Sequence, residues 1–329
     1  MPEPIPLTSR IATAVYKACI RSDGLRLRLW QRVRCWLIGN FDDPPTVMLV
    51  HGQRLEMPLS HGLPAYLAGN PHYDTLPSRL GALIRAHSGA LIAIDVGANI
   101  GDTIAAFDCD ANDYFVAVEP NPKFHAYLRR NWPDAARVRP VQALCAADSG
   151  SGRFSFREYA GTASARMDGT GQALPTTTVD GLVASDSRLH ALNLLKVDTD
   201  GHDFEVLRGA TDALSTHRPA ILFECDPFGN QNYLTDLRAT LNRLEEAGYR
   251  RFVTYDNRGR LMGCHVLSAP RGFYRDVFRQ LVTQDLYFDI LLLRDELMDE
   301  FLAAEIVHFR AQAPEPSIAW PADLAPFDE

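Results

Sequence analysis

The chain has 329 residues, of which 46% are hydrophobic and 22% charged, a composition typical of a globular protein with a substantial buried core. Its formal net charge of −8 argues against a general nucleic-acid binder, because clustered Lys and Arg side chains drive binding to phosphates. No apolar run is long enough for a transmembrane helix. The six cysteines are scattered and contain no Cys-x-x-Cys pair, which predicts reduced thiols in a cytoplasmic protein.

The beginning of the chain is basic and amphipathic. Seven Arg and Lys residues lie between Arg10 and Arg34 against one acid, Asp23, and apolar residues such as Leu25 and Trp36 are interleaved with them. This pattern fits either a helical extension with a solvated basic face or a peripheral contact with anionic lipid or an acidic carrier. Short apolar pieces after Pro44 predict a β-rich cap. We therefore expect residues 1–70 to form an N-terminal helical and β extension.

Residues 91–103 carry the most informative pattern, Leu-Ile-Ala-Ile-Asp-Val-Gly-Ala-Asn-Ile-Gly-Asp-Thr. The apolar run is too short for a buried helix and ends at a glycine, which predicts a central strand of a parallel sheet. Gly97 allows a sharp turn and a close approach to a ligand, Asn99 tolerates a left-handed backbone, and Gly101 lets a helix pack closely. Asp102 and Thr103 would open that helix, whose free N–H groups attract a carboxylate or phosphate.

A second acid follows the next predicted strand. Residues 114–118 are apolar, and Glu119 stands at their carboxyl end, where a carboxylate accepts hydrogen bonds from both hydroxyls of a ribose. Asn121 and Pro122 are typical of the N-cap and first turn of a following helix. The β-α-β-α order predicts a doubly wound α/β fold.

The loop itself distinguishes between nucleotide ligands. The Gly-x-Gly-x-x-Gly fingerprint of nicotinamide cofactors does not fit the register of Gly97 and Gly101. Asp95, immediately before the loop, would repel a pyrophosphate but stabilise a cationic sulfonium and an α-amino group. The pattern favours S-adenosylmethionine, and the alternative is a glycine turn that only joins strand to helix.

Later segments continue the alternation of strands and helices. Further strands are predicted over residues 138–144, 153–157, 192–197, 220–224, 251–255 and 287–293, and helices over 233–247 and 297–309. A helical insertion around Gly272 to Asp285 would precede the last strand and give the sheet a reversed edge strand. We expect residues 71–311 to form one α/β domain with a mostly parallel seven-stranded sheet, and residues 312–329, rich in Pro, Ala and acids, to form a loosely ordered tail.

Ligand chemistry in an open α/β sheet gathers at the carboxyl ends of its strands. Four acids stand at four predicted strand ends: Asp95, Glu119, Asp198 and Glu224. Lys196 alternates with Asp198 along one strand, so both side chains can face the same side, and Asp200 and His202 follow in the next loop.

Three segments together resemble the FkbM-type methyltransferases, and the likeness covers roughly residues 70 to 300. These segments are residues 94–102, residues 118–120, and residues 195–210 with the sequence Leu-Lys-Val-Asp-Thr-Asp-Gly-His-Asp-Phe-Glu-Val-Leu-Arg-Gly-Ala. The resemblance implies a Rossmann-like class I fold and an S-adenosylmethionine-dependent O-methyltransferase, and many such relatives act on sugar hydroxyls of glycans, polysaccharides or glycosylated natural products. Asp200 departs from the family, which more often has glutamate there.

The resemblance and the strand-end positions give a set of expected site residues. Cofactor contacts are expected from Asp95, Gly97, Ala98, Asn99, Gly101, Asp102, Thr103, Glu119, Pro120, Leu144, Cys145, Asp148 and Asp198. By analogy Leu144 and Cys145 would lie against the adenine, with Asp148 near its amine. Asp200 or His202 is the candidate base, and Lys196 and Asp198 would orient the acceptor or the methionine part of the cofactor.

Alternatives to this assignment concern both the metal and the function. Asp198, Glu224 and Asp226 supply oxygen ligands of the kind Mg²⁺ takes, although acids at strand ends also serve as caps or cofactor contacts, and we favour a site without metal. A nicotinamide-dependent oxidoreductase and a catalytically silent adapter that keeps the fold are the alternative functions. The expected partner is a small-molecule or glycan acceptor and not a nucleic acid.

Overall fold

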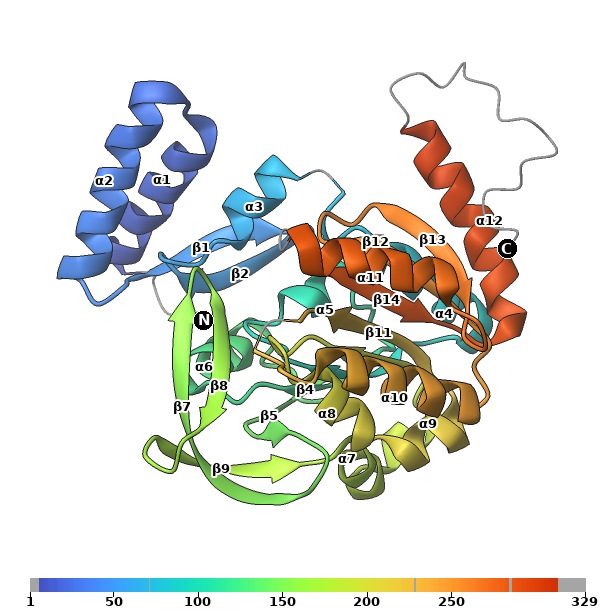
Figure 1. Ribbon diagram of the computed structural model, residues 1–329. Helices are drawn as coiled ribbons and strands as arrows, with labels where there is room; N and C mark the ends of the chain where they lie inside the picture. The colour runs from blue at the N-terminus through green and yellow to red at the C-terminus, as the bar shows by residue number, and fades with distance from the viewer. Residues whose placement is uncertain (1–5, 71, 228, 284–285, 313–329) are drawn as a thin grey trace.

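An eight-stranded sheet forms the centre of the structure, a computed structural model that describes residues 6–70, 72–227, 229–283 and 286–312 (Figure 1). The strand order is β13-β12-β14-β11-β10-β3-β4-β5. The strands are β3 (Ile92–Val96), β4 (Tyr114–Val118), β5 (Val138–Val141), β10 (Leu194–Val197), β11 (Ala220–Cys225), β12 (Arg251–Asp256), β13 (Leu261–Val266) and β14 (Phe288–Leu292). Strands β11, β10, β3, β4 and β5 pair in parallel, which confirms the doubly wound, mostly parallel sheet.

The far side of the sheet differs from the expectation in two respects. The reversed strand β14 does not lie at the edge, because it pairs antiparallel with both β11 and β12. The edge is an eighth strand, β13, which forms a hairpin with β12. β13, with the sequence Leu-Met-Gly-Cys-His-Val, pairs on one side only and is half-buried or exposed along its length, and Gly263 and His265 interrupt the continuous apolar run that is typical of a central strand. Within the predicted insertion, α11 (Arg271–Thr283) forms, and Asp285 lies outside the described residues.

Helices cover both faces of the central sheet and bury it from both sides. One face is covered by α7 (Val179–Ser185), α8 (Asp203–Arg208), α9 (Thr211–His217), α10 (Tyr233–Glu246) and α11, together with a 3₁₀ turn (Ser187–Ala191). The other face is covered by α4 (Leu76–Ser88), α5 (Asp102–Ala106), α6 (Pro122–Asn131) and α12 (Asp295–Ala311).

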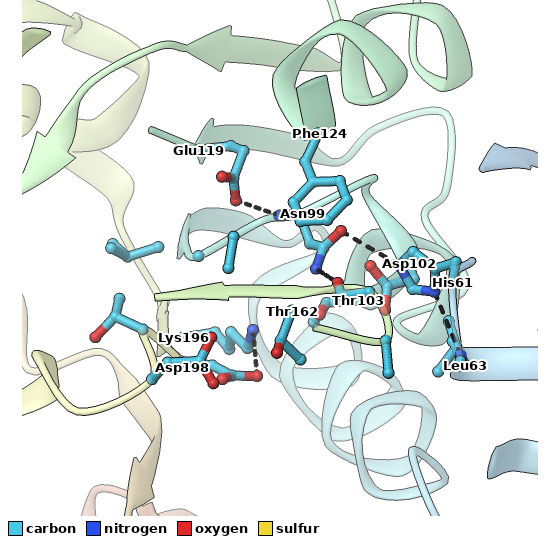
Figure 2. Close-up of a pocket in the computed structure, with 18 of the residues that line it drawn as sticks. His61, Leu63, Asn99, Asp102, Thr103, Glu119, Phe124, Thr162, Lys196 and Asp198 are labelled. Atoms are coloured by element: carbon cyan, nitrogen blue, oxygen red, sulfur yellow. Dashed lines mark hydrogen bonds and ion pairs between the residues drawn. The ribbon is translucent and has the colours of Figure 1, made fainter. Parts of the chain in front are cut away.

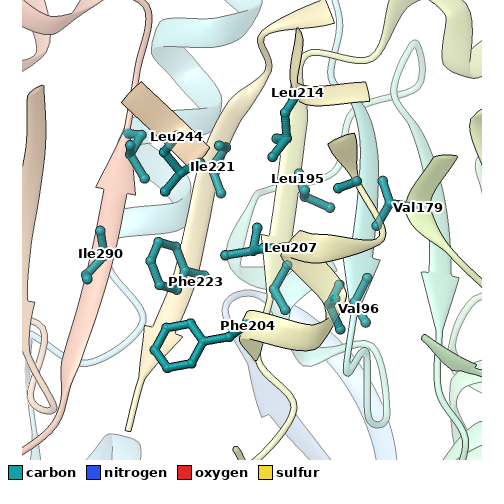
Figure 3. Packing of buried hydrophobic residues seen from close by; sticks show 14 of the residues in the cluster. Val96, Val179, Leu195, Phe204, Leu207, Leu214, Ile221, Phe223, Leu244 and Ile290 are labelled. Carbon is teal, nitrogen blue, oxygen red and sulfur yellow. The ribbon is translucent and has the colours of Figure 1, made fainter. Parts of the chain in front are cut away.

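Alternate residues of the same strand face the two layers of helices. Leu195, Ile221 and Ile290 pack with the first layer, where Figure 3 shows them beside Leu207 of α8 and Leu244 of α10. Their neighbours along the strands belong to the opposite cluster. This burial on both faces explains why the central strands appear in the sequence as continuous apolar runs.

A smaller sheet of four strands, ordered β6-β9-β7-β8, lies beside the central one. Its strands are β6 (Leu144–Cys145), β7 (Gly150–Tyr159), β8 (Thr162–Met167) and β9 (Gln172–Thr177). The single strand expected over residues 138–144 is therefore wrong: β5 ends at Val141 in the central sheet, and Leu144 already pairs with Thr176 of β9. Apolar residues continue at Val138, Val141, Ala143 and Leu144 on both sides of the break, so periodicity alone does not show where one strand ends and the next begins.

The N-terminal extension packs as a helical hairpin on a β-hairpin. It consists of α1 (Leu7–Arg21), α2 (Gly24–Asn40), β1 (Pro45–Val50), β2 (Gln53–Pro58) and α3 (Leu63–Gly69). Its core includes Tyr16 and Met57 and continues into Phe124 and Tyr127 of α6, so the extension is joined to the central domain by apolar packing. No helix among the described residues has the length and apolar character needed to cross a bilayer.

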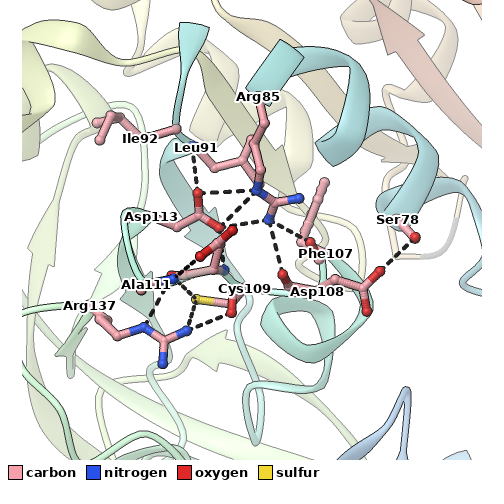
Figure 4. A network of polar contacts seen from close by, with 12 residues as sticks. Ser78, Arg85, Leu91, Ile92, Phe107, Asp108, Cys109, Ala111, Asp113 and Arg137 are labelled. Carbon is pink, nitrogen blue, oxygen red and sulfur yellow. Dashed lines mark hydrogen bonds and ion pairs between the residues drawn. The ribbon is translucent and has the colours of Figure 1, made fainter.

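A buried ion pair fixes the amino ends of β3 and β4. Asp113, 2% exposed, accepts hydrogen bonds from the Arg85 guanidinium of α4, the shortest of them 2.6 Å, and from the backbone N–H groups of Leu91 at 2.8 Å and Asp110 at 2.6 Å (Figure 4). Because Asp113 is, among the described residues, the only anion paired with Arg85 and also accepts two backbone N–H groups, the carboxylate holds α4 against the start of both strands.

We predict that Asp113→Ala lowers the free energy of unfolding by about 3 kcal/mol, because it leaves a mostly buried guanidinium without a counter-charge and two backbone donors unpaired. Glu56→Ala is the matched control, since Glu56 pairs with Arg130 at an exposed position and its loss should cost less than about 1 kcal/mol. Urea unfolding followed by circular dichroism measures both variants. Equal losses in the two variants would contradict the assigned role of Asp113.

Candidate active site

A cavity of about 710 Å³ opens at the carboxyl ends of β3, β4 and β10. The loops after these strands, the N-terminal extension and the β7–β8 hairpin all contribute to its wall. The expected site residues that line it are Gly97, Asn99, Asp102, Thr103, Glu119, Pro120, Leu144, Cys145, Lys196, Asp198, Asp200 and His202. The structure therefore brings together most residues that the sequence singles out, from four separate segments.

Glu119 is fixed in place by the first loop. Its Oε2 accepts the backbone N–H of Asn99 at 2.9 Å (Figure 2), and its Oε1 accepts that of Asn121 at 2.7 Å. Burial raises the pKa of Glu119 to about 8, while the two backbone N–H groups act in the opposite direction. In its ionised form each oxygen of Glu119 keeps a further lone pair, so the carboxylate can then accept two more hydrogen bonds from a ligand in the cavity.

Gly97 is required by a contact between two loops. Its φ is +80°, and a Cβ at this position would lie 1.7 Å from the carbonyl oxygen of Asp198. The backbone N–H groups of Gly97 and Ala98 both donate to the carbonyl of Val118, at 2.9 and 3.0 Å. The glycine thus lets the loops after β3, β4 and β10 meet backbone to backbone, a reason that adds to the predicted approach of a ligand.

A buried lysine links the neighbouring strands β3 and β10. Lys196 is 6% exposed, and its Nζ lies 3.1 Å from Asp198 Oδ2 and 3.5 Å from Asp95 Oδ1. Burial lowers the pKa of Lys196, but the two carboxylates outweigh this effect and raise it above its usual value. The ammonium is therefore charged, and it partly neutralises the acids around it.

Asp200 and His202 lie in the cavity wall and are held by the β7–β8 hairpin. Asp200 has a left-handed backbone with φ of +51°, and its carboxylate accepts the backbone N–H of Ala163. Burial, followed by the neighbouring Asp198 carboxylate, raises the pKa of Asp200 to about 6. His202 Nε2 lies 3.0 Å from the carbonyl oxygen of Ala165, and because a carbonyl only accepts, this nitrogen carries the proton and Nδ1 keeps a lone pair.

The hairpin and the N-terminal extension meet over the first loop. Asn99 Nδ2 donates to the carbonyl of Gly161 at 2.6 Å, and Asn99 Oδ1 lies 3.4 Å from His61 Nε2 (Figure 2). The backbone N–H of Gly62 donates to the carbonyl of Ala160 at 2.6 Å. Asn99, whose φ of +48° confirms the predicted left-handed backbone, thus joins three parts of the cavity wall.

Several cavity residues do not appear among those expected from the sequence. They are His61, Tyr66 and Tyr73 of the extension, Phe124 of α6, Thr162 and Ala163 of the hairpin, and Tyr287 before β14. Tyr66 and Tyr73 form an edge-to-face pair with ring centroids 4.5 Å apart. The β7–β8 hairpin turns at Ala160 and Gly161, both with positive φ, and Gly161 is the residue type in the sequence that favours such a turn.

Other expected residues lie outside the cavity wall. Asp95 is buried beneath it against Lys196, Ala98 and Gly101 support the loop from behind, and Asp148 is exposed in solvent. Gly101 instead receives the ring of Trp132, whose Nε1 donates to the Gly101 carbonyl at 3.0 Å. The helix that Asp102 opens, α5, has only five residues. Burial raises the pKa of Asp102 to about 7.

The alternative metal site is not assembled in the structure. No group of three or more His, Cys, Asp or Glu side chains among residues 6–70, 72–227, 229–283 and 286–312 is arranged to hold a metal ion, so Asp198, Glu224 and Asp226 do not form the Mg²⁺ site considered above. Glu224 instead lines a separate space of about 70 Å³ beside its antiparallel partner Asp289. Burial raises the pKa of both carboxyls well above the ordinary range.

The cavity residues fit S-adenosylmethionine better than a dinucleotide. Four carboxyl groups and one ammonium line the wall, from Asp102, Glu119, Asp198, Asp200 and Lys196. A cation bound beside these acids lowers their raised pKa values and favours their ionised forms, whereas a pyrophosphate raises them further, so the wall favours a cationic ligand. Glu119, with both oxygens oriented by the loop, is placed to bind the hydroxyls of a ribose. The volume is also within the range of small-molecule sites.

Comparison with known proteins identifies the central segment. Residues 95–251 match the model of the methyltransferase FkbM domain. A hexuronic acid methyltransferase, AglP, from Haloferax volcanii is 34% identical to this chain over 126 residues, which cover 37% of this chain and 51% of that protein. The chain thus spans about half the length of this curated relative.

Among solved structures, the methyltransferase FkbM from Methylobacillus flagellatus superposes with a TM-score of 0.35 at 18% identity, covering 50% of this chain and 40% of that one. The N-terminal domain of human METTL16 in complex with SAH superposes with a TM-score of 0.39 at 13% identity, covering 79% of this chain and 81% of that one. The likeness to this family rests on the sequence match: residues 95–251 match the methyltransferase FkbM domain, the family that the motifs resemble.

Proposed function

We propose that this protein is an S-adenosylmethionine-dependent O-methyltransferase whose acceptor is a sugar hydroxyl in a glycan, a polysaccharide or a glycosylated natural product. The carboxylate-lined cavity at the ends of β3, β4 and β10 carries the proposal, because it joins an oriented ribose-binding acid, Glu119, with a candidate base, Asp200. The similarity to a hexuronic acid methyltransferase supports a sugar acceptor.

The cofactor, when bound, supplies an electrophilic methyl group on a sulfonium. Glu119 would bind its ribose hydroxyls, while Gly97 and its neighbours present backbone next to the amino-acid end. Leu144 and Cys145, which line the same cavity, offer an apolar surface for the adenine. The negative wall around Asp198 and Asp102 would stabilise the positive charge of the donor.

Asp200 is the better placed of the two candidate bases. A sugar hydroxyl is a weak nucleophile at neutral pH, so a carboxylate that accepts its proton accelerates the transfer by about 10² to 10⁴. The raised pKa of Asp200, about 6, makes it a stronger base than an ordinary aspartate while leaving it ionised at pH 7. His202 has its Nε2 bonded to Ala165 and would act through Nδ1. Lys196 and Asp198 would orient the acceptor.

The acceptor would enter beside the extension. Tyr66, Tyr73 and Tyr287 line this part of the cavity, and Tyr66 is 39% exposed. Aromatic rings of this kind present an apolar face and a hydroxyl, a combination suited to the C–H and O–H groups of a sugar ring. Methylated positions would be found by mass spectrometry of glycans and lipids from cells with and without the protein, as a methyl-sized shift.

We predict that Glu119→Gln weakens binding of S-adenosylhomocysteine by about tenfold to a hundredfold, because an amide can no longer accept hydrogen bonds on both sides and must turn its NH₂ toward a backbone N–H. Calorimetric titration of the purified protein measures the affinity. Glu245→Gln, at an exposed position on α10, is the control and should bind like the wild type.

Titration with NAD in the same experiment distinguishes the alternatives. Binding of NAD without binding of S-adenosylhomocysteine would favour a nicotinamide-dependent oxidoreductase. Binding of neither ligand by the folded protein would favour an adapter that has kept the fold without its chemistry.

We predict that Asp200→Asn lowers turnover by about 10² or more while changing the affinity for S-adenosylhomocysteine little, because the side chain acts on the acceptor proton. A base must be ionised, so wild-type turnover should fall as the pH drops below the pKa of about 6, and this dependence should disappear in the variant. Transfer of labelled methyl groups to a glycan extract from cells lacking the protein measures turnover.

Asp212→Asn, an exposed carboxyl on α9, is the matched control for this substitution and should keep wild-type turnover and the wild-type pH profile. Wild-type turnover in Asp200→Asn would remove Asp200 from the mechanism. The same measurement on His202→Asn would then show whether the histidine is the base.

A further inference from the structure

The outer face of α2 exposes large apolar side chains to solvent. Leu25 is 82% exposed, Leu29 59% and Trp36 57%, and Trp36 forms an edge-to-face pair with Phe41, itself 45% exposed. Leu29 and Trp36 follow Leu25 by four and eleven residues, so the three side chains lie on one stripe of the helix. Large exposed apolar side chains that gather in this way mark an interaction surface.

Cations share this outer face. Arg28 and Arg32 follow Leu25 by three and seven residues, which places them along the same stripe, and both are exposed. Arg26, and Arg10, Lys17 and Arg21 of α1, are also exposed. Within the part of the chain that the structure describes, none of these six cations forms an ion pair with a carboxylate. The helical hairpin is therefore a local basic surface on a chain whose net charge is −8.

The opposite face of α2 holds the helix in this orientation. Leu37 is buried, and Leu27, Trp30 and Val33 pack against the core of the extension. Arg34, also on this side, donates from Nε to the carbonyl of Leu59 at 2.9 Å, and its guanidinium lies 4.2 Å from the ring of Tyr16. The exposed stripe is thus the side of α2 that faces away from the core of the extension. The helical hairpin itself lies at the periphery of the molecule (Figure 1).

We propose that the outer face of α2 binds the surface of an anionic phospholipid bilayer. Leu25, Leu29 and Trp36 would enter the boundary between head groups and acyl chains, and Arg28 and Arg32 would contact the lipid phosphates. Amphipathic helices lie at bilayer surfaces in this way when cations accompany their apolar stripe, and Trp side chains favour this boundary. Leu7 and Ile11 of α1, 69% and 46% exposed, offer further apolar surface on the same hairpin.

Charge favours this occupant over a second copy of the chain. The outer face contributes several cations and its helix, α2, contains no acid, so two identical faces would repel each other in a symmetric dimer. A bilayer with anionic lipids supplies the complementary charge over an extended surface. Each Lys or Arg near such a surface strengthens binding by about fivefold.

The test is co-sedimentation of the full chain with vesicles of phosphatidylcholine mixed with phosphatidylglycerol, and with vesicles of phosphatidylcholine alone. We expect binding to the mixed vesicles only, and weaker binding in high salt, because the screening length falls from about 10 Å at 0.1 M to about 3 Å at 1 M. Arg28→Glu/Arg32→Glu should lower the partition coefficient by about 25-fold or more. Arg129→Glu/Arg238→Glu, an equal change of charge at exposed positions elsewhere, should lower it much less.

The apolar stripe is tested by Leu25→Ser/Leu29→Ser, which should also release the protein from the mixed vesicles, while Val307→Ser on α12, at a position that is 69% exposed, should not. Quenching of tryptophan fluorescence by brominated lipid should be partly lost in Trp36→Phe, which reports insertion of this side chain. Thermal unfolding confirms that each variant is folded.

Two results would overturn the proposal. The first is equal binding of the wild type and the α2 variants to the mixed vesicles. The second is a wild-type dimer in sedimentation equilibrium that Leu25→Ser/Leu29→Ser converts to a monomer, without vesicle binding by either. Both readouts are independent of methyl transfer, so the lipid proposal and the proposed enzymatic function fail or succeed separately.

Discussion

The contact between Gly97 and the backbone of Asp198 is the constraint on which the cavity depends. Two neighbouring parallel strands, β3 and β10, end at the same edge of the sheet, and their following loops must pass each other there. With 1.7 Å between an ideal Cβ and the Asp198 carbonyl oxygen, a larger residue at position 97 would push the loops apart. Asp198 and Asp200 would then move away from the Glu119 side of the cavity. Substitution of Gly97 therefore changes the fold locally as well as the binding of a ligand.

The second constraint is electrostatic. A wall with four carboxyl groups is unfavourable without compensation, because like charges in a poorly hydrated space repel and raise one another's pKa. Lys196 supplies part of the compensation from beneath the wall, between Asp95 and Asp198. The remaining excess of negative charge leaves the cavity suited to a cation. The ion pairs of Lys196 with Asp95 and Asp198 therefore affect both the stability of the fold and the charge of the cavity wall, since their loss would alter that charge.

The sequence predicts a feature well when that feature depends on residues near one another in the chain, and poorly when it depends on contacts between distant segments. The strands β3, β4 and β11 are buried on both faces and appear as apolar runs, and the acids at their ends follow from the rule that parallel strands end at one edge. The strands β8 and β13 pair at exposed positions, and their sequences, such as Thr-Ala-Ser-Ala-Arg-Met in β8, lack an apolar period. The contact of His61 with Asn99 joins residues 38 positions apart, which no periodicity or motif predicts.

The cavity wall has one part inside the segment that matches the family model and another part outside it. The family match covers residues 95–251, which include Glu119, Asp198, Asp200 and the β7–β8 hairpin. His61, Tyr66, Tyr73 and Tyr287 lie outside that segment and form the opposite side. A methyl donor needs the same surroundings whatever hydroxyl it meets, whereas an acceptor is chosen by the shape and polarity of the wall it touches. In the proposed reaction the acceptor is therefore selected by the extension and by the segment before β14, both of which lie outside the family match.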